Sequence, residues 1–401
     1  MGYLVSVVGG GQLARMMAQP AAALHIGLRA LVEADDGSAA QVLPDSPVGF
    51  PADLDAMREL TRGADVLTFE HEHIPAETLT ALENEGVNIQ PSAQALAAAQ
   101  DKIHMRRVLS EAGVPCPRWA AASTAEEVRE FGDEVGWPII VKVPTGGYDG
   151  KGVVVLDRED GEGWHTVAQW LNSPRGEVLA EEKVNFVREL AALSARRPSG
   201  QFVAWPVVQT VQENGVCSEV ISPAPLTDEA KTTALRIAHQ VASTLGVTGV
   251  LAVELFEADT GALLVNELAM RPHNSGHVTI EASRTSQFEQ HLRAVLDLPL
   301  GATEPTCDHA VMVNLLGSAL EEPRAAYPEV MRRYPEAKVH LYGKSVRPGR
   351  KLGHVTITGN DPERMLARAR AAVALLRGDG GAATGEDDAR QNARTGQKEI
   401  A

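Results

Sequence analysis

The chain has 401 residues, of which 44% are hydrophobic and 22% charged, a composition typical of a globular protein with two or three domains. Its formal net charge of -16 argues against broad binding to nucleic acid or to anionic membranes, although a local cluster of cations could hold a small anionic ligand. The three cysteines include no CxxC motif, which indicates neither a zinc site nor a disulfide framework. Because we also find no signal peptide and no run of about 18 apolar residues, we expect a cytoplasmic protein.

Three zones follow one another along the chain. Residues 1–98 alternate short apolar runs with helical patterns, and this succession predicts βαβ units and a Rossmann-like parallel sheet. The expected strands of this zone are 3–8, 29–34 and 64–70, and its expected helices are 12–24 and 77–85.

Residues 99–300 form the second zone, in which residues 115–182 are expected to make a separate lobe. Its expected strands include 139–143, 153–156, 250–256 and 263–268, and its expected helices are 102–112 and 227–245. The third zone, residues 301–377, predicts a small β-rich domain with strands 310–317, 338–344 and 354–359 and a helix at 362–376. Residues 378–401 lack apolar periodicity, and we expect them to be a disordered tail.

The first motif is the glycine-rich turn "VVGGGQLARMMA" between the first strand and the first helix. Gly9, Gly11 and Ala14 satisfy the dinucleotide fingerprint GxGxxG/A, and Glu33 ends the next strand where a ribose-binding acid would stand. On these residues alone an NAD enzyme is a minority interpretation, because many tight βα turns select glycines.

A second glycine-rich segment, "VPTGGYDGKGVVVL", lies between two expected strands. A Walker A loop would run into a helix and end in GK[ST], and Gly150-Lys151-Gly152 does not. A strand–loop–strand with four glycines predicts a flap whose backbone amides close over phosphates, and Lys142 on the incoming strand supplies a point charge. An ordinary long hairpin is the less favoured alternative.

The third motif is "NELAMRPHNSGH", residues 266–277, which follows a mostly apolar hairpin. If Thr260 and Gly261 are the two central turn residues, Glu254 and Glu267 face one another on the same side of the hairpin. Facing carboxylates repel one another unless something compensates their charge. Carboxylate oxygens with Asn266 nearby suit Mg²⁺, with Mn²⁺ as the alternative ion. We therefore favour a metal site over two solvated glutamates.

These motifs together resemble the ATP-grasp superfamily and, within it, the N5-carboxyaminoimidazole ribonucleotide synthetase family. "GGGQLARM", "FEHEHIP", "RPHNSGH" and "HLYGKSVRPGRKLGH" occur in the expected order, and the resemblance covers residues 3 to about 376. It implies an α/β fold of three domains: an N-terminal Rossmann-like domain (1–98), an ATP-grasp domain with a lid lobe (99–300), and a small C-terminal β-rich domain (301–377). It also implies a homodimer and the ATP-dependent carboxylation of 5-aminoimidazole ribonucleotide with bicarbonate through carboxyphosphate. With this resemblance the NAD interpretation loses its support.

The resemblance further implies roles for individual residues. Lys102 and Lys142 would contact ATP phosphates, residues 146–152 would form the flap, residues 181–184 would pair with the adenine edge, and Glu189 would bind the ribose. The implied ATP-binding residues are Lys102, Lys142, Gly146, Gly147, Tyr148, Asp149, Gly150, Lys151, Gly152, Glu181, Glu182, Lys183, Val184, Glu189, Gln212, Asn266 and Glu267.

Tyr148, Arg271 and His273 are the implied catalytic residues, and Glu254 and Glu267 the implied metal ligands. The implied residues for the ribonucleotide are Gln12, Leu13, Glu70, Glu72, Asn274, Lys344, Arg350 and Lys351. Lys344, Arg350 and Lys351 would grip the 5′-phosphate, whereas Arg347 in the same segment is expected to face solvent. Two other classes stay open: an ATP-grasp ligase with a different acceptor, and a catalytically silent ATP-binding subunit.

Overall fold

The N-terminal domain is built on a small parallel sheet. The computed structural model describes residues 2–147 and 151–379, and its first sheet has the order β2-β1-β3 with all pairs parallel. The strands are β1 (Leu4–Val8), β2 (Gly27–Leu31) and β3 (Val66–Phe69). β3 is buried throughout, as expected of a strand covered on both faces. The predicted βαβ arrangement is confirmed.

Helices surround this sheet and lead into the next domain. They are α1 (Gln12–Ala23), α2 (Leu54–Thr61), α3 (Ala76–Asn84), α4 (Ala93–Gln100) and α5 (Lys102–Glu111). Asp53, Ser92 and Asp101 cap the N-termini of α2, α4 and α5 with side-chain hydrogen bonds, which explains where these helices begin. The helices predicted from periodicity are confirmed to within a residue or two, while α2 and α4 were not predicted.

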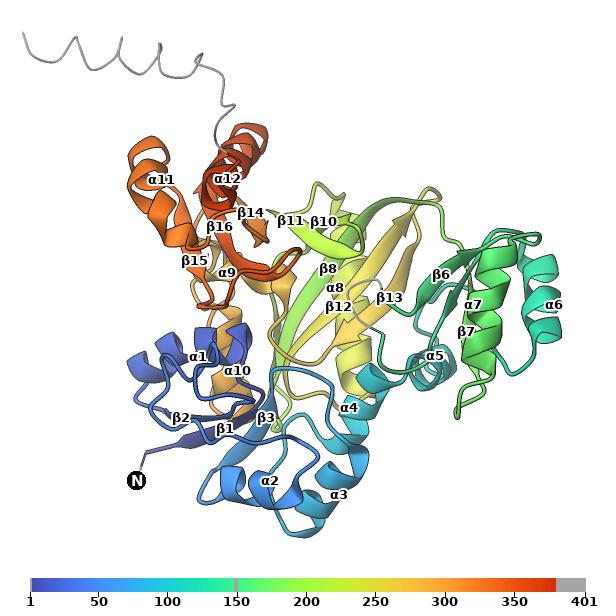
Figure 1. The fold of residues 1–401 in the computed structure, drawn as a ribbon, viewed down its shortest axis with the longest axis horizontal. Helices are drawn as coiled ribbons and strands as arrows, with labels where there is room; N and C mark the ends of the chain where they lie inside the picture. The colour runs from blue at the N-terminus through green and yellow to red at the C-terminus, as the bar shows by residue number, and fades with distance from the viewer. Residues whose placement is uncertain (1, 148–150, 380–401) are drawn as a thin grey trace, which may run out of the picture.

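The lid lobe is a four-stranded antiparallel sheet of order β4-β7-β5-β6. Its strands are β4 (Trp119–Ala122), β5 (Ile139–Lys142), β6 (Val153–Leu156) and β7 (Val178–Glu182). The helices α6 (Ala125–Val135) and α7 (Gly161–Leu171) cover its outer face (Figure 1). Val128, Phe131 and Val167 on these helices form one apolar core with the strands. The flap residues Tyr148, Asp149 and Gly150 lie outside the described residues.

A large antiparallel sheet forms the body of the molecule, in the order β13-β12-β8-β10-β11-β14-β16-β15, with β9 beside β8. Its strands are β8 (Phe186–Arg196), β9 (Phe202–Ala204), β10 (Val208–Glu213), β11 (Val216–Ser222), β12 (Gly249–Ala258), β13 (Leu263–Ala269), β14 (His309–Leu316), β15 (Lys338–Leu341) and β16 (Lys351–Gly359). The C-terminal strands thus extend the large sheet, although they have a hydrophobic core of their own. The exact domain boundaries and the nature of the tail (residues 380–401 are outside the described residues) stay predictions.

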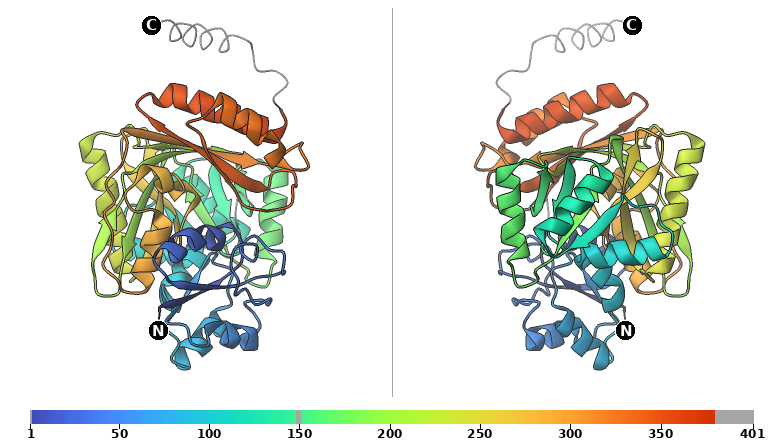
Figure 2. Two further views of the ribbon diagram at one scale, coloured as in Figure 1. Left: turned by 90° about the vertical axis from the view of Figure 1, so that its left-hand side faces the viewer. Right: turned by 90° about the vertical axis from the view of Figure 1, so that its right-hand side faces the viewer.

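Helices pack on both faces of the large sheet. They are α8 (Asp228–Thr244), α9 (Thr279–Ala282), α10 (Gln287–Val295), α11 (Tyr327–Arg333) and α12 (Pro362–Arg377), with short 3-10 turns η1 (Asn274–Gly276) and η2 (Pro323–Ala326). Helix α10 also packs against the N-terminal domain, because Phe288, Leu292 and Val295 belong to its apolar core. The N-terminal strands and α12 lie at opposite ends of the molecule (Figure 2). Within the described ranges, no helix is both long enough and apolar enough to cross a membrane.

The β12–β13 hairpin differs from the expected register. Its turn has three residues, since Ala258 N donates to Ala262 O at 2.8 Å and Gly261 N to Ala258 O at 2.9 Å. Gly261 has the predicted positive φ, +83°. The register is therefore offset by one residue near the turn, and a β-bulge opposite Glu254 restores the expected pairing from Val253↔Leu268 onward. The predicted two-residue turn was wrong, but the bulge still places residues 266 and 267 opposite Glu254.

Candidate active site

A cavity of about 840 Å³ lies where the lid lobe, the large sheet and the N-terminal domain meet. Most of the predicted site residues line it. Those that do are Glu72, Lys102, Lys142, Gly146, Gly147, Glu181, Glu182, Lys183, Val184, Glu189, Gln212, Glu254, Asn266, Glu267, Arg271, His273, Asn274 and Lys351. The others are spread elsewhere: Gln12, Leu13, Glu70, Lys151, Gly152, Lys344 and Arg350 do not line the cavity, and Tyr148, Asp149 and Gly150 are outside the described residues.

The alternation of β12 explains how the Glu254 carboxylate comes to stand on a mostly apolar strand. Leu251, Val253 and Leu255 belong to the core that α8 covers, whereas Val250 and Ala252 pack on the opposite face. Glu254 continues this second face into the cavity.

On β13 the bulge has a matching effect. Val265 and Leu268 both point into the core under α8 although they are three positions apart in the strand, so Asn266 and Glu267 between them both reach the cavity. Within the cavity, the Lys102 ammonium lies 2.8 Å from Glu267 Oε1. The bulge is therefore the backbone device that brings an amide and a carboxylate from one strand to the site.

A buried ion-pair network lies behind the lysine of the lid sheet. Lys142 Nζ is 2.7 Å from Glu181 Oε2 and 3.3 Å from Asn266 Oδ1, and the fully buried Arg106 binds the other Glu181 oxygen. Burial alone would raise the pKa of Glu181, but Arg106 and Lys142 lower it to about 2. The Glu181 side chain thus faces the lysine.

Arg106 was not predicted as part of the site. It stands three residues before Leu109 and three after Ile103 on α5, and both of these neighbours are buried. A guanidinium at a buried position of an amphipathic helix needs a buried acid. The apolar periodicity of α5 therefore indicated that Arg106 would pair with an acid. The partner on β7 could not be read from local sequence.

Two further groups shape the electrostatics near Glu254. Glu189, on the adjacent strand β8, has its pKa raised to about 7, first by burial and second by the Glu254 charge. His273 lies on the other side, with Nε2 3.2 Å from Glu254 Oε1. Burial alone would raise the pKa of Glu254, but His273, Arg271 and Lys351 lower it, so Glu254 is the charged member of the two acids.

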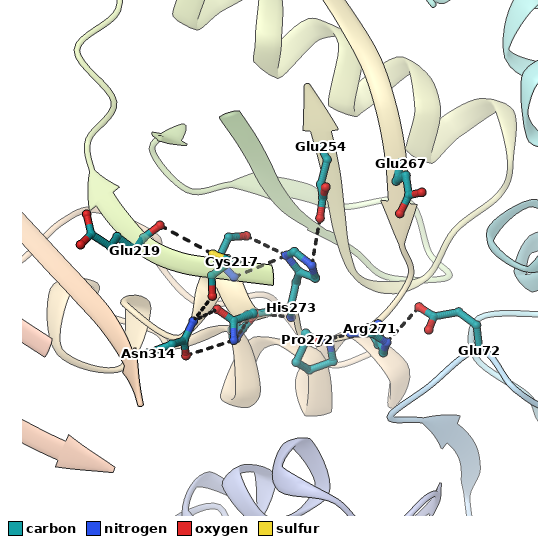
Figure 3. Close-up of polar contacts among 12 residues, drawn as sticks. Glu72, Cys217, Glu219, Glu254, Glu267, Arg271, Pro272, His273 and Asn314 are labelled. Carbon is teal, nitrogen blue, oxygen red and sulfur yellow. Dashed lines mark hydrogen bonds and ion pairs between the residues drawn. The ribbon is translucent and has the colours of Figure 1, made fainter. Parts of the chain in front are cut away.

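The polar density of residues 271–277 is explained by partners from three domains (Figure 3). Arg271 Nε lies 2.9 Å from Glu72 Oε1 of the N-terminal domain. Asn274 exchanges two amide hydrogen bonds with Asn314 of β14, at 2.8 and 3.3 Å. Asn314 also donates to Cys217 O on β11 at 2.8 Å, so a residue that was not predicted holds the loop against the large sheet.

The glycine-rich turn at the N-terminus of α1 is filled by Glu70. Its carboxylate accepts hydrogen bonds from Gly11 N and, at 3.1 Å, from Ala14 N. A Cβ at Gly9 or Gly11 would collide with the Glu70 side chain, and Gly9 has φ +102°. The glycines are therefore needed for the close approach of an acid to the helix N-terminus, an arrangement that does not support the dinucleotide interpretation.

One residue of the cationic segment 344–351 contacts the start of α1, next to the same glycine-rich turn. Lys344 Nζ donates to Gln12 Oε1, whereas Arg350 Nη1 bonds Ser345 Oγ at 2.6 Å. Arg347 is exposed, as predicted. Leu13 is 6% exposed and packs in the N-terminal core, so its side chain is not available to a substrate and only its backbone could take the predicted role.

Comparison with known proteins identifies the family. The profile for the ribonucleotide synthetase preATP-grasp domain matches residues 3–100, the ATP-grasp domain profile matches 107–288, and the phosphoribosylaminoimidazole carboxylase C-terminal domain profile matches 310–368. The N5-carboxyaminoimidazole ribonucleotide synthase of Mycobacterium tuberculosis is 53% identical over 93% of this chain and 87% of its own length. The chain belongs to the N5-carboxyaminoimidazole ribonucleotide synthase family.

Other family members agree in sequence and in structure. The N5-carboxyaminoimidazole ribonucleotide synthase of Corynebacterium ammoniagenes is 47% identical over 93% of this chain and 92% of its own length. The structure of the Aspergillus clavatus enzyme in complex with ADP and 5-aminoimidazole ribonucleotide is 30% identical, with a TM-score of 0.84 over 94% of this chain and 98% of that one. The predicted ATP-grasp fold and the predicted family are confirmed.

Proposed function

We propose that this protein carboxylates 5-aminoimidazole ribonucleotide with bicarbonate and ATP, giving N5-carboxyaminoimidazole ribonucleotide, ADP and phosphate, a step of purine biosynthesis. One observation carries the proposal beyond family membership: a single cavity gathers the lysines Lys102 and Lys142, the carboxylates Glu254 and Glu267, and the loop residues Arg271 and His273. Such a set can hold a polyphosphate and a small anion side by side.

ATP occupies the part of the cavity between the lid sheet and β12–β13. Lys102 and Lys142 bind its phosphates, the backbone after Glu181 meets the adenine edge, and Glu189 binds the ribose hydroxyls, with Gln212 alongside. The buried ion pair with Glu181 orients the Lys142 ammonium. The flap, residues 146–152, closes over the phosphates and keeps water from the reactive intermediate.

Glu254 and Glu267, with Asn266, are the residues that would hold Mg²⁺. Their donor set of carboxylate and amide oxygens fits this ion, which retains sites for substrate phosphates. Burial first and the Glu254 charge second raise the pKa of Glu189 to about 7, and a cation would relieve the repulsion between these two acids. When bound, the ion neutralises charge that develops on the phosphates.

Bicarbonate attacks the γ-phosphate to form carboxyphosphate, which delivers CO₂ to the exocyclic amine of the ribonucleotide. Arg271 and His273 stand beside this anion, and Tyr148, which lies outside the described residues, is the third proposed catalytic residue. Asn274, with Glu70 or Glu72, orients the aminoimidazole end. Lys344, Arg350 and Lys351 bind the 5′-phosphate next to Gln12 and the backbone of Leu13, where the Lys344–Gln12 contact joins two segments far apart in the chain.

The alternatives differ in what they predict. A ligase with another acceptor would release ADP without the aminoimidazole ribonucleotide, and a silent subunit would not release it at all. The cavity retains both carboxylates and Lys142, which argues against a silent subunit. A homodimer and a cytoplasmic location remain our expectations.

The discriminating experiment measures ADP release with bicarbonate and the ribonucleotide each omitted in turn. Release that requires both compounds supports the proposal. Release that is independent of the ribonucleotide contradicts it.

A further inference from the structure

The backbone of His273 is held by the side chain of Gln287, a fully buried residue in the first turn of α10. His273 N donates to Gln287 Oε1 at 2.8 Å, and Gln287 Nε2 donates to His273 O at 2.8 Å. Because a backbone N–H can only donate and a carbonyl can only accept, these two bonds determine the orientation of the amide. One side chain thus clamps both polar backbone groups of a residue beside the proposed bicarbonate site.

The clamp is itself held in place. Gln287 N donates to Thr279 Oγ1 at 2.9 Å, and Gln287 Nε2 lies 3.0 Å from His277 Nδ1. Burial lowers the pKa of His277 well below its ordinary value, so its ring is neutral and Nδ1 can accept this bond. At Gly276 a Cβ would collide with the Gln287 amide, so the glycine is what allows the close packing of the loop on the amide.

The clamp bears on the imidazole of His273 because the ring is tied at both nitrogens. His273 Nδ1 lies 2.8 Å from Ser275 Oγ, and Nε2 lies 3.2 Å from Glu254 Oε1. A shift of the His273 backbone would therefore move the ring relative to Glu254 and to the reacting anion.

We propose that Gln287 is a positioning residue for the carboxylation reaction, which acts by clamping the His273 backbone so that the imidazole faces Glu254 and the bicarbonate site. The inference rests on the proposed function. Because a misplacement of about 1 Å in an active site can cost about 100-fold in rate, loss of the clamp lowers kcat. The proposed ATP contacts are Lys102, Lys142 and the backbone after Glu181, none of which touches the clamp, so the KM for ATP changes little.

The same helix offers a matched control in Gln290. It is also fully buried, and it clamps another residue in the same way: Gly301 N donates to Gln290 Oε1 at 2.7 Å, and Gln290 Nε2 donates to Gly301 O at 2.8 Å. Gly301 does not line the cavity. Replacing either glutamine by leucine removes one such pair of hydrogen bonds between a side chain of α10 and the backbone of a loop residue. Only Gln287, however, holds a residue that lines the cavity.

The test compares Gln287→Leu and Gln290→Leu with the wild-type enzyme in melting temperature and in the kinetics of ADP release. We expect similar losses of thermal stability, a fall in kcat of about 10-fold or more for Gln287→Leu, and wild-type kcat for Gln290→Leu. The KM for ATP stays near that of the wild type in both. Equal falls in kcat, or an unchanged kcat in Gln287→Leu, would overturn the inference.

If Gln287→Leu does not fold, Gln287→Glu provides the test, because it keeps the size and the acceptor for His273 N but loses the donor to His273 O. We expect kcat to be low at neutral pH and to recover relative to the wild type as the pH falls, since protonation of the new carboxyl restores a donor. A kcat equal to that of the wild type at every pH would overturn the inference. An inactive wild-type enzyme would instead overturn the proposed function, and the inference with it.

Discussion

Glu254 of β12 and His273 of the loop after β13 lie 3.2 Å apart, measured between Oε1 and Nε2 (Figure 3). This contact joins the proposed metal-binding strand to the proposed bicarbonate-binding loop. On one side of the pair stands Glu189, whose pKa Glu254 helps to raise, and on the other stands the Gln287 clamp. Small changes at this pair should therefore affect chemistry more than folding.

The first prediction concerns the carboxylates of the hairpin. Glu267→Gln is expected to lower kcat for ADP release by about 100-fold or more, because a neutral amide is a poor ligand for a cation that stabilises developing phosphate charge. The protein should fold normally, since Glu267 is partly exposed. The control is Glu257→Gln on β12, whose carboxylate pairs with Arg188 and does not line the cavity. Near wild-type turnover of Glu267→Gln at ordinary Mg²⁺ would show that the metal assignment is wrong.

A second prediction concerns the buried network behind Lys142. Glu181→Gln leaves the fully buried Arg106 without a charged partner, and we expect the free energy of unfolding to fall by about 3–5 kcal/mol in denaturant titrations. Glu182→Gln changes the next residue of β7, whose partner Arg118 is largely exposed, and should cost at most about 1 kcal/mol. Similar losses for the two variants would contradict the account of the network.

The hairpin shows what could and could not be predicted from the sequence. Apolar periodicity located β12 and β13, because the alternation of side chains across a strand depends only on local residues. The three-residue turn and the bulge were missed, because their one-residue offsets cancel and nothing local distinguishes them from the simple register. The proposed site residues were located through motifs, whereas Arg106, Asn314 and Gln287 were missed because their partners are distant in sequence.

The third prediction uses the buried His291, which joins two domains through Thr68 Oγ1 at 2.8 Å and Val250 N at 3.0 Å. Burial lowers its pKa to about 3 from an ordinary value of 6.5. Between these values the unfolded chain binds the proton more readily, so stability is full above pH 6.5 and falls as the pH drops toward 3.

Urea titrations of the wild type and of His291→Gln at neutral pH and at about pH 5 would measure this effect. Between neutral pH and about pH 5, the free energy of unfolding should fall by about 2 kcal/mol less in His291→Gln than in the wild type. The control is His165→Gln at an exposed position of α7, and in this variant the free energy of unfolding should depend on pH as it does in the wild type. Identical dependence in the wild type and His291→Gln would refute the prediction.

The fourth prediction concerns the cationic segment that follows β15. Arg350→Ala should raise the KM for the ribonucleotide by about 10-fold or more, the expected cost of losing one charge-assisted contact to a phosphate, while the KM for ATP changes little. Arg347→Ala removes the same kind of side chain from the same segment at an exposed position and should change neither KM. Loss of ATP affinity with ribonucleotide affinity kept would move the segment to the nucleotide site.

The most direct test of the central claim follows the oxygen atoms of bicarbonate. If bicarbonate attacks the γ-phosphate and carboxyphosphate then releases CO₂, one bicarbonate oxygen remains on the inorganic phosphate. With ¹⁸O-labelled bicarbonate, ATP, Mg²⁺ and 5-aminoimidazole ribonucleotide, mass spectrometry should find one ¹⁸O in the phosphate for each ADP formed. Phosphate without ¹⁸O, formed at the same rate as ADP, would contradict the proposed carboxylation through carboxyphosphate.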